Sequence, residues 1–280
     1  MKELKMSISS SVFEYNIETS QRYELVSDQI STINITVKDT LDIDIVGLTD
    51  SKGTFLINVY GSGQLNLNLH FSPYSQWNFL YMNRSDEHLS VNEMVTLEAH
   101  TTISANYGEL TNGKHDKVSA FRLIGEFSHL DVQGASIAFN ELKWKFDVVH
   151  IAKDSYAMVK NHAVVFKGGT LGLEVLGTIE HGYHRSKTHQ ETRVINLDEG
   201  VKAIINPKLI INENDVEASH AASVGQPDPE AVYYLQSRGL TYAKTMEMIT
   251  LGYLMPIVDV IENESIREEL TQTIQTKVIG

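Results

Sequence analysis

The chain has 280 residues, of which 42% are hydrophobic and 21% charged, a composition typical of a globular protein with its own core. Its 23 Lys and Arg stand against 36 Asp and Glu, and the resulting formal net charge of −13 repels nucleic acid and anionic membranes. Cysteine is absent, which excludes disulfides, thiolate metal ligands and a cysteine nucleophile.

The first 50 residues are rich in Ser, Thr and β-branched residues and carry no apolar stripe at helical spacing. For residues 1–50 we therefore expect an irregular segment or short strands. The N-terminus shows no apolar stretch of the signal-peptide type, and no run of 18 apolar residues occurs in the sequence. These features predict a cytoplasmic protein without a membrane partner.

Residues 51–226 are expected to form a β-rich core. Apolar residues alternate with polar ones in many short segments separated by Gly, Asn or Asp, and no helical pattern of ten or more residues interrupts them between Phe55 and Asn212. Such a pattern disfavours alternating βαβ units and leaves a sandwich, a barrel or a β-solenoid. The predicted strands include Phe55–Tyr60, Leu65–His70, Leu142–Val149, Ala157–Phe166, Leu171–Glu180, Thr192–Leu197, Val201–Ile205 and Lys208–Asn212.

Residues 227–280 follow helical rules instead. Asp228 can cap a helix that begins at Pro229, and Gly239 can end it in a left-handed conformation. A second helix is predicted from Leu240 to Leu254, with Pro256 interrupting it. A capping box, Ser265 with Glu268, predicts the start of a final helix.

The final helix carries one narrow apolar stripe, formed by Ile266, Leu270, Ile274 and Val278. One interpretation is that this stripe packs on the protein's own core. The other is that the helical region offers a platform to a partner protein, with these apolar anchors: Tyr253, Leu254, Met255 and Ile257.

Motifs for nucleotide binding, hydride transfer or hydrolysis are absent from the sequence. A histidine-rich stretch from His181 to His189 contains imidazoles that could bind a metal, but the neighbouring Arg185 and Lys187 oppose a bound cation. His220 lies in a block of small residues, where a hydrogen-bonded structural histidine is the default interpretation.

Several strings in the second half of the chain occur together and in order. The chain resembles the SufB/SufD family of iron-sulfur cluster assembly proteins, and in particular its SufD-like branch. The resemblance covers about residues 160–280 and rests on these strings: Val165–Gly169, Ser186–Gln190, Asn206–Ile211, Asn214–Val216, Ser219–Gly225 and Tyr233–Gly239.

The resemblance implies a mainly β fold, a right-handed parallel β-helix with a C-terminal α-helical region. It also implies a SufB-like partner, bound through the end of the β-helix, and a SufC-type ATPase, bound through the C-terminal helices. The matching histidine, His220, would lie near the subunit interface as a candidate ligand of a transient iron-sulfur cluster, with no cofactor held tightly by this chain alone. The dimer edge would comprise Ser219, His220, Ala221 and Ala222.

Two departures from the family pattern affect this expectation. SufD-like proteins often carry Cys two residues before the matching histidine, where this chain has Ala218. With no thiol, the chain cannot itself accept sulfur as a persulfide. The helical N-terminal region of full-length relatives also has no counterpart in the pattern of residues 1–50.

The leading hypothesis is a non-catalytic scaffold subunit of a SufBCD-type complex. One alternative is a homodimer that binds the ATPase without a SufB partner. Another is a β-solenoid enzyme acting on polysaccharides, with acid and base roles for three carboxylates, Asp131, Glu141 and Asp147.

Overall fold

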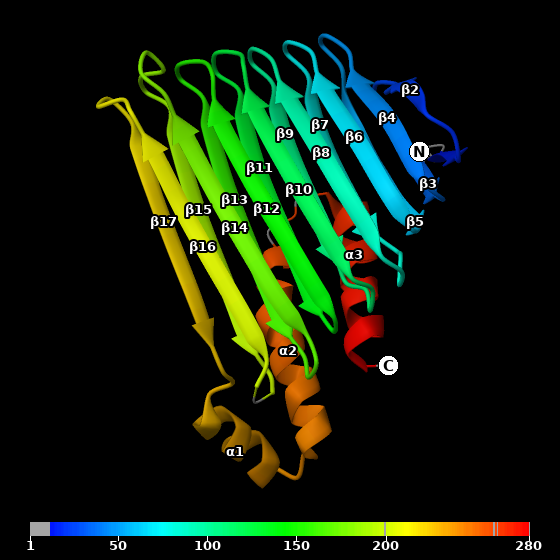
Figure 1. The fold of residues 1–280 in the computed structure, drawn as a ribbon, viewed down its shortest axis with the longest axis vertical. Helices are drawn as coiled ribbons and strands as arrows, with labels where there is room; N and C mark the ends of the chain where they lie inside the picture. Colours follow the sequence, from blue (N-terminus) through cyan, green and yellow to red (C-terminus); the bar gives the residue numbers. More distant parts are fainter. Residues whose placement is uncertain (1–11, 199, 260, 262, 280) are drawn as a thin grey trace, which may run out of the picture.

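The computed structural model describes residues 12–198, 200–259, 261 and 263–279. Successive strands alternate between two sheets, and every strand pair in both sheets is parallel (Figure 1). The odd sheet contains β1 (Val12–Ile17), β3 (Ile30–Val37), β5 (Lys52–Gly61), β7 (Gln76–Asn83), β9 (Thr102–Glu109), β11 (His129–Ala138), β13 (Tyr156–Val165), β15 (Lys187–Asn196) and β17 (Glu217–Gly225). The even sheet contains β2 (Gln21–Glu24), β4 (Thr40–Gly47), β6 (Gly63–Phe71), β8 (Leu89–Leu97), β10 (His115–Leu123), β12 (Glu141–His150), β14 (Thr170–Ile179) and β16 (Lys202–Ile211).

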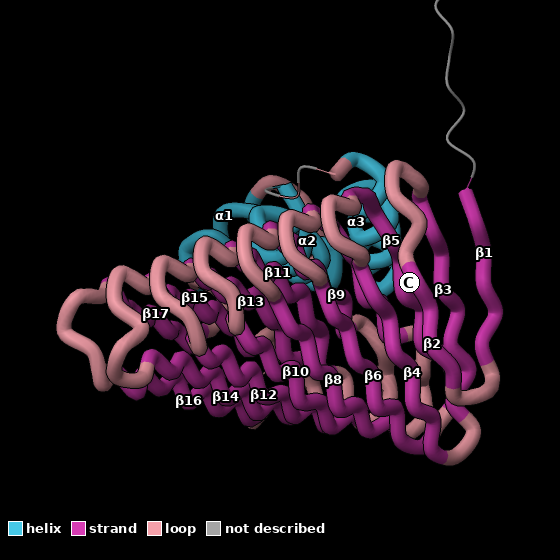
Figure 2. The backbone as a smooth tube through the Cα atoms, turned by 90° about the horizontal axis from the view of Figure 1, so that it is seen from above, coloured by secondary structure: helices cyan, strands magenta, loops and turns pink. Residues whose placement is uncertain are grey.

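This arrangement is a parallel β-solenoid, in which each coil contributes one strand to each sheet. Figure 2 shows the two sheets as separate layers seen from above. The prediction of a β-solenoid is therefore confirmed, and the alternative predictions of a sandwich and of a barrel are wrong. Both sheets continue across residue 50, because β3 pairs with β5 from Ile30 and Thr54 onward and β4 pairs with β6 from Thr40 and Gln64 onward.

The coils lengthen along the chain. Asn34 and Asn58, which are partners in neighbouring coils, are 24 residues apart, whereas Glu180 and Asn212 near the other end are 32 residues apart. The later strands also reach ten residues in length. Each coil is consequently longer at the C-terminal end of the solenoid than at its N-terminal end, although the two sheets lie closer together there (Figure 2).

The main core lies between the two sheets. Inward-facing residues alternate with outward ones along each strand, and aromatic side chains fill the middle coils. Phe55 and Phe79 stack across neighbouring coils with ring centroids 5.3 Å apart, and Tyr107 packs edge-on to Trp144 at 5.4 Å. Each fully buried ring contributes roughly 2 kcal/mol through removal of its apolar surface from water.

The eight predicted strands all lie within or across the observed ones, but two of them are a single element. Val201–Ile205 and Lys208–Asn212 belong to β16, which runs through Pro207. The Asn212 amide donates to the Ile179 carbonyl, so amides at even positions of β16 face β14 and those at odd positions face away. Pro207 therefore takes the place of an amide that would point to the open edge, where the lack of a donor costs little.

Three helices follow the solenoid: α1 (Pro229–Ser237), α2 (Tyr242–Asp259) and α3 (Glu264–Ile279). The predicted start of α1 is confirmed, since the Asp228 carboxylate accepts a hydrogen bond of 3.0 Å from the Glu230 amide. Gly239 follows α1 with a φ of +91°, as predicted.

Two predicted boundaries in this region are wrong. The second helix does not stop before Pro256, because this residue lies on the exposed side of α2 while Leu254 and Ile257 are buried and hold the helix on the odd sheet. The final helix is capped by Asn263 rather than Ser265: the Asn263 side-chain oxygen accepts from the Ile266 amide at 3.1 Å.

A second apolar core joins α2 and α3 to the outer face of the odd sheet, as Figure 2 shows for the helices. The stripe of α3 is buried at Ile266, Leu270 and Ile274, which confirms that it packs on the protein's own core. Among the described residues, no helix is both long and apolar enough to span a bilayer.

Candidate functional site

The last coil forms an open end of the solenoid. Within the described chain β17 pairs only with β15, and β16 pairs only with β14, so both strands present one free edge at the same end. Every residue from Glu217 to Gly225 is exposed. Free strand edges carry unpaired backbone groups, which makes this end a surface suited to strand pairing with another chain.

The predicted site residues lie together on β17 but point to its two faces. His220 and Ala222 align with Gln190 and Thr192 of β15, which are buried inside the solenoid, so their side chains continue the inner row at the open end. Ser219 aligns with His189 on the outer face, where its hydroxyl lies 2.8 Å from the His189 ring nitrogen Nδ1. Ala221 shares the face of Ser219.

The buried layer beneath His220 is polar. The side chains of Thr188, Gln190 and Thr192 are almost fully buried in the preceding strand. With its amide turned to satisfy its neighbours, Gln190 donates to the Val175 carbonyl at 3.1 Å and accepts from the Gly177 amide at 3.0 Å. Gln190 thereby ties the odd sheet to the even sheet directly under the open end.

The two free edges differ in their backbone donors. The Glu217 amide donates to the Ser186 carbonyl of the neighbouring coil, so odd positions of β17 face β15 and the amides of His220 and Ala222 face outward. These outward amides remain available as donors, whereas Pro207 removes a donor from the centre of the β16 edge. An incoming strand can therefore pair more completely with β17 than with β16.

The histidine-rich stretch does not converge on one point. His181 and His184 lie in the turn between β14 and β15, and His181 lies 3.6 Å from a carboxylate oxygen of Glu213. His189 lies within β15 and bonds Ser219. Over the residues that the structure describes, no group of three or more His, Cys, Asp or Glu side chains is placed to hold a metal ion.

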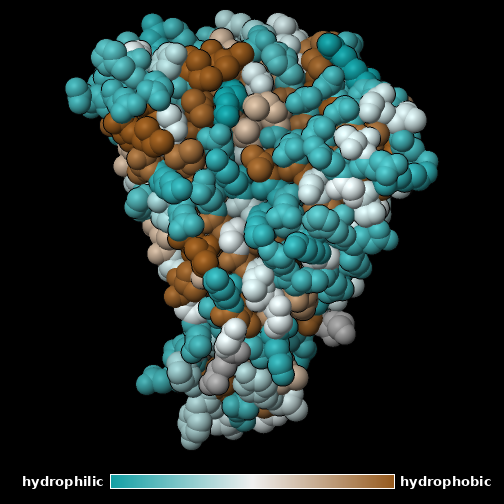
Figure 3. Space-filling view, viewed as in Figure 1, coloured by the Kyte–Doolittle hydropathy of each residue, from teal (hydrophilic) through white to brown (hydrophobic). Residues whose placement is uncertain are grey.

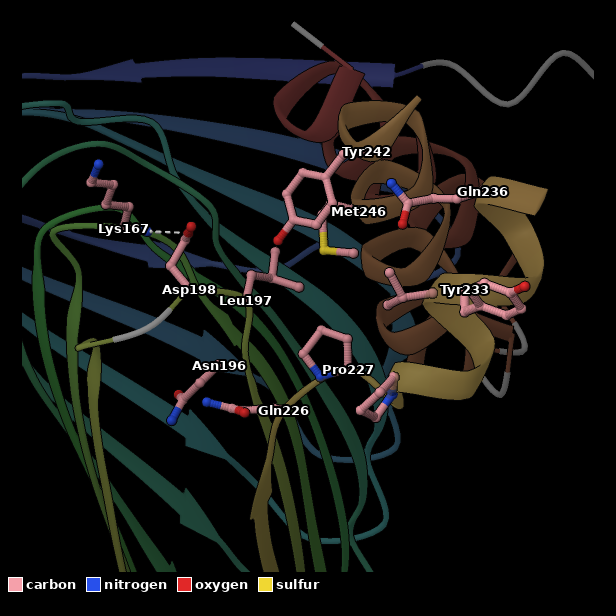
Figure 4. Close-up of a pocket in the computed structure, with 12 residues that line it drawn as sticks. Lys167, Asn196, Leu197, Asp198, Gln226, Pro227, Tyr233, Gln236, Tyr242 and Met246 are labelled. Atoms are coloured by element: carbon pink, nitrogen blue, oxygen red, sulfur yellow. Dashed lines mark hydrogen bonds between the residues drawn. The ribbon is translucent and has the colours of Figure 1, made fainter. Parts of the chain in front are cut away.

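A groove of about 580 Å³ lies between the solenoid and the first two helices (Figure 4). Lys167 and Asp198 form one side, where the Asp198 carboxylate accepts from the Lys167 amide at 2.8 Å. Tyr233, Tyr242 and Met246 come from the helices on the other side. The helix α1 buries none of its own residues, so it leaves a full face to solvent.

The four residues predicted as a platform occupy different environments. Leu254 and Ile257 are 0% and 2% exposed and pack into the core beneath α2. Tyr253 and Met255 are half-buried against the same core. The large apolar side chains that α1 and α2 expose are Tyr233, Tyr234, Tyr242 and Met248.

The carboxylates considered for polysaccharide chemistry do not form a pair. Asp131 lies on the odd sheet, whereas Glu141 and Asp147 lie on β12 of the even sheet, six positions apart and thus roughly 20 Å along the strand. That separation exceeds the roughly 5–10 Å between the carboxyl groups of glycosidases. Hydrogen bonds from Lys114 and Lys143 lower the pKa of Glu141 to about 2, which suits a permanent anion rather than a proton donor.

A buried ionic cluster inside the solenoid escaped the sequence analysis. The Lys117 ammonium is buried 3.2 Å from a Glu109 oxygen and lies over the Tyr81 ring, 3.1 Å from its centroid. Glu93 accepts from the Ser119 hydroxyl at 2.6 Å in the same layer. Burial raises the pKa of Glu93 and lowers that of Lys117. One signal in the sequence could have found it. Phe121 and Leu123 point inward on β10, and because alternate residues of a strand share a face, Lys117 points inward as well.

Figure 3 shows the opposite side of the molecule from α2 and α3, where hydrophobic patches interrupt a largely hydrophilic surface. Charged side chains on the even sheet pair with each other across coils, as Lys145 and Lys208 do with Glu174 at 3.5 and 2.9 Å. Exposed pairs of this kind contribute little to stability.

Comparison with known proteins gives a consistent family. The family model for the SufBD core domain of SUF system FeS cluster assembly matches residues 61–253. The chain is 31% identical over 173 residues to the iron-sulfur cluster assembly protein SufD of Bacillus subtilis, covering 61% of this chain and 40% of that protein.

Two further relatives align over shorter shares. SufD of Escherichia coli is 29% identical over 106 residues, covering 37% of this chain and 25% of the relative. A SufBD family protein of Mycobacterium bovis is 26% identical over 170 residues, covering 60% and 19%. The aligned part thus spans less than half of each of these relatives. Since the family model covers more than half of the present sequence, from the third coil into α2, the chain belongs to the SufBD core family of iron-sulfur cluster assembly proteins.

Proposed function

We propose that the protein is a non-catalytic scaffold subunit in iron-sulfur cluster assembly, with the cluster as cargo rather than as a resident cofactor. The observation that carries this proposal is the open end of the solenoid in a member of the SufBD core family. The absence of cysteine supports a structural role, because sulfur transfer through a persulfide requires a thiol on another subunit.

In this proposal the β17 edge pairs with a SufB-like partner or with a second copy of the chain. The exposed small residues Ser219, Ala221 and Ala222 allow close approach of another backbone, and the outward amides of β17 supply the donors. His220 then lies at the interface with its imidazole exposed, where it can ligate iron of a transient cluster.

A SufC-type ATPase binds the helical surface in the same proposal. Because Leu254 and Ile257 hold α2 to the sheet, the contact falls to the exposed side chains Tyr233, Tyr242 and Met248 and to the groove beside them. Exposed tyrosines bury a large area at little entropic cost and are frequent at protein interfaces.

The edge assignment is tested with Ala222→Pro. This change removes an outward amide only, as Pro207 does on β16, and so leaves the β15 pairing intact. Light scattering measures the dissociation constant of the dimer, formed with a SufB-like partner or between two copies of this chain. We expect Ala222→Pro to raise this constant at least tenfold and Ala222→Ser to leave it unchanged. Dimers of unchanged affinity in the proline variant would refute pairing through β17.

The same measurement separates the two forms of assembly. A complex with one SufB-like subunit for each copy of this chain indicates a heterodimer, whereas two copies with the ATPase alone indicate the homodimer. Light scattering of the complex purified from its own cell gives this stoichiometry directly.

The ATPase surface is tested with Tyr233→Ala combined with Tyr242→Ala. The matched control is Tyr74→Ala, since Tyr74 is 58% exposed on the distant edge of the solenoid. We expect the double variant to lose most binding to a SufC-type ATPase in calorimetry and the control to keep it. Equal binding by both would place the ATPase elsewhere.

The role of His220 is tested by His220→Ala, with His181→Ala as the control because the His181 side chain is 90% exposed in a turn. If His220 ligates the cargo, the assembled complex should carry less iron and a weaker charge-transfer absorption in the first variant only. Full cluster loading of the His220 variant would leave dimerisation as the only role of this edge.

A further inference from the structure

A second polar site lies on the outer face of the odd sheet, away from the open end. Its cavity has a volume of about 370 Å³ and is bordered by Ile261, between α2 and α3. The strand register arranges its polar side chains in three rows across β7, β9 and β11: Gln76, Thr102 and His129; Asn78, Ser104 and Asp131; then Asn106 and Gln133.

The third row lies on the same line of positions across the sheet as an apolar residue of the core beneath the helices. Its member on β7 is Leu80, which is fully buried in the contact with α2 and α3. Asn106 and Gln133 continue that row and are only 0% and 9% exposed. Two amides at the margin of an apolar interface are costly unless their polar atoms are satisfied.

These two amides retain unpaired acceptors. The Asn106 amide nitrogen donates to the Phe79 carbonyl at 3.0 Å, which fixes the orientation of the group. Among the residues that the structure describes, its side-chain oxygen Oδ1 has no hydrogen-bond partner, and neither has Oε1 of Gln133. Leaving a buried acceptor unpaired costs about 1–3 kcal/mol, so a donor that reached either oxygen would recover part of that cost.

The charge of the site selects the kind of ligand. Its lining contains no Lys or Arg, and its acid, Asp131, has one oxygen 2.9 Å from the ring nitrogen Nε2 of His129 and its second oxygen without a bond in the described structure. An anion would find no Lys or Arg among the described lining residues, and the His129 ring already bonds Asp131. A ligand rich in N–H donors would meet a carboxylate at the entrance. Further in, the Gln133 oxygen lies just below the pocket surface, but no hydrogen bond among the described residues holds this amide, so it can turn its oxygen toward the ligand.

We propose that this pocket binds a small organic cation carrying an ammonium or guanidinium group, which Asp131 attracts and Gln133 receives through its unpaired oxygen. The site is independent of the dimer edge and of the ATPase surface. The cation can be a free metabolite of the amine or guanidine class, or an arginine side chain presented by another protein, because both offer the same donors.

The test is calorimetric titration of the intact chain with agmatine, which carries both groups, and with sorbitol and acetate as neutral and anionic probes. We expect saturable agmatine binding that Asp131→Asn weakens at least tenfold, equivalent to about 1.4 kcal/mol. The matched control is Asp44→Asn, an exposed aspartate on the even sheet that bonds Asn68 at 2.8 Å. It should bind agmatine as the wild type does.

Three outcomes would overturn the proposal. The first is no saturable binding of agmatine at concentrations up to about 10 mM, the weakest affinity that would still count as specific. The others are an equal loss of agmatine affinity in both variants, or binding of sorbitol as tight as that of agmatine. Equal loss would mean that agmatine responds only to the net charge of −13. A short arginine-containing peptide that displaces agmatine supports a protein side chain as the natural ligand. Failure of the peptide to compete supports a free small molecule.

Discussion

At the residue scale, Lys117 shows how the interior tolerates a charge. Its ammonium group is buried between Glu109 and the rings of Tyr81, Tyr107 and Trp144, at 3.1–4.8 Å from the ring centroids. Such an ion pair is not a large net source of stability, but removal of one partner leaves a buried charge without compensation. The aromatic faces add a cation–π contribution.

We therefore expect Lys117→Met to lower the free energy of unfolding by about 3–5 kcal/mol. Adding Glu109→Gln should restore a large part of the loss, because the isolated carboxylate is then gone. Lys145→Met, which breaks an exposed pair with Glu174, should cost less than about 1 kcal/mol. Urea unfolding of five proteins measures these differences: the wild type, Lys117→Met, Glu109→Gln, their double variant and Lys145→Met. Additive losses at Lys117 and Glu109 would argue against coupling.

The stability of the protein should also depend on His150. This side chain is 0% exposed, and burial lowers its pKa from 6.5 to about 4. The unfolded state then binds a proton more readily than the folded state, so the stabilising contribution is full above pH 6.5 and is lost as the pH falls toward 4. The shift corresponds to roughly 3 kcal/mol between those limits.

His150→Gln should flatten this part of the pH profile even if it lowers stability at pH 7. The check is the midpoint of urea unfolding between pH 7.5 and 4.5 in both proteins. Burial also lowers the pKa of His115 and His162, so a residual slope of the same sign is expected in the variant. An unchanged slope would mean that His150 does not titrate as described.

At the element scale, helix boundaries depend on contacts that the sequence pattern does not contain. The capping box at Ser265 is a valid local signal, yet Asn263 caps α3, because its side-chain nitrogen also donates to the Thr54 hydroxyl of β5 at 2.7 Å. The burial of Leu254 and Ile257 likewise carries α2 past Pro256. The apolar periodicity predicted the existence of the helices, whereas tertiary contacts determine where they begin and end.

Asn263→Ala should destabilise the protein by about 1–2 kcal/mol, since it removes both the cap and the tie to β5. Ser265→Ala should change the unfolding free energy by less than about 0.5 kcal/mol. Thermal or urea unfolding distinguishes the two variants. A larger loss of unfolding free energy for Ser265→Ala than for Asn263→Ala would mean that Ser265 caps the helix, as the sequence predicted.

For the strands, the sequence pattern predicted the elements but not how they pair. Period-two alternation identified β-structure correctly, because each inward residue contributes to one continuous core. It did not distinguish a solenoid from a sandwich, since the alternation is the same when strands pair in parallel with the next coil or antiparallel with a neighbour. The family resemblance in residues 160–280 resolved that choice. The polar pocket on β7, β9 and β11 could not be predicted, because its residues meet only through coil-to-coil register.

At the scale of the whole molecule, stability should fall toward the open end. The middle coils have neighbours on both sides and fully buried rings, whereas within the described ranges of the chain β17 has one neighbour and no buried residue. In hydrogen exchange of the isolated chain, we expect amides of β9–β12 to exchange orders of magnitude more slowly than those of β16 and β17. Protection of β17 equal to that of β11 would show that this end is already covered in solution.

The lengthening of the coils bears on how copies of the protein can associate. A stack of identical coils could grow without limit, because its last rung would accept the first rung of the next molecule, as in a fibril. Here a first coil of about 24 residues would have to stack on a last coil of about 32 residues, so the inward side chains of the two coils would not be in register. The mismatch opposes head-to-tail polymerisation and favours a closed pair in which two matching C-terminal ends meet.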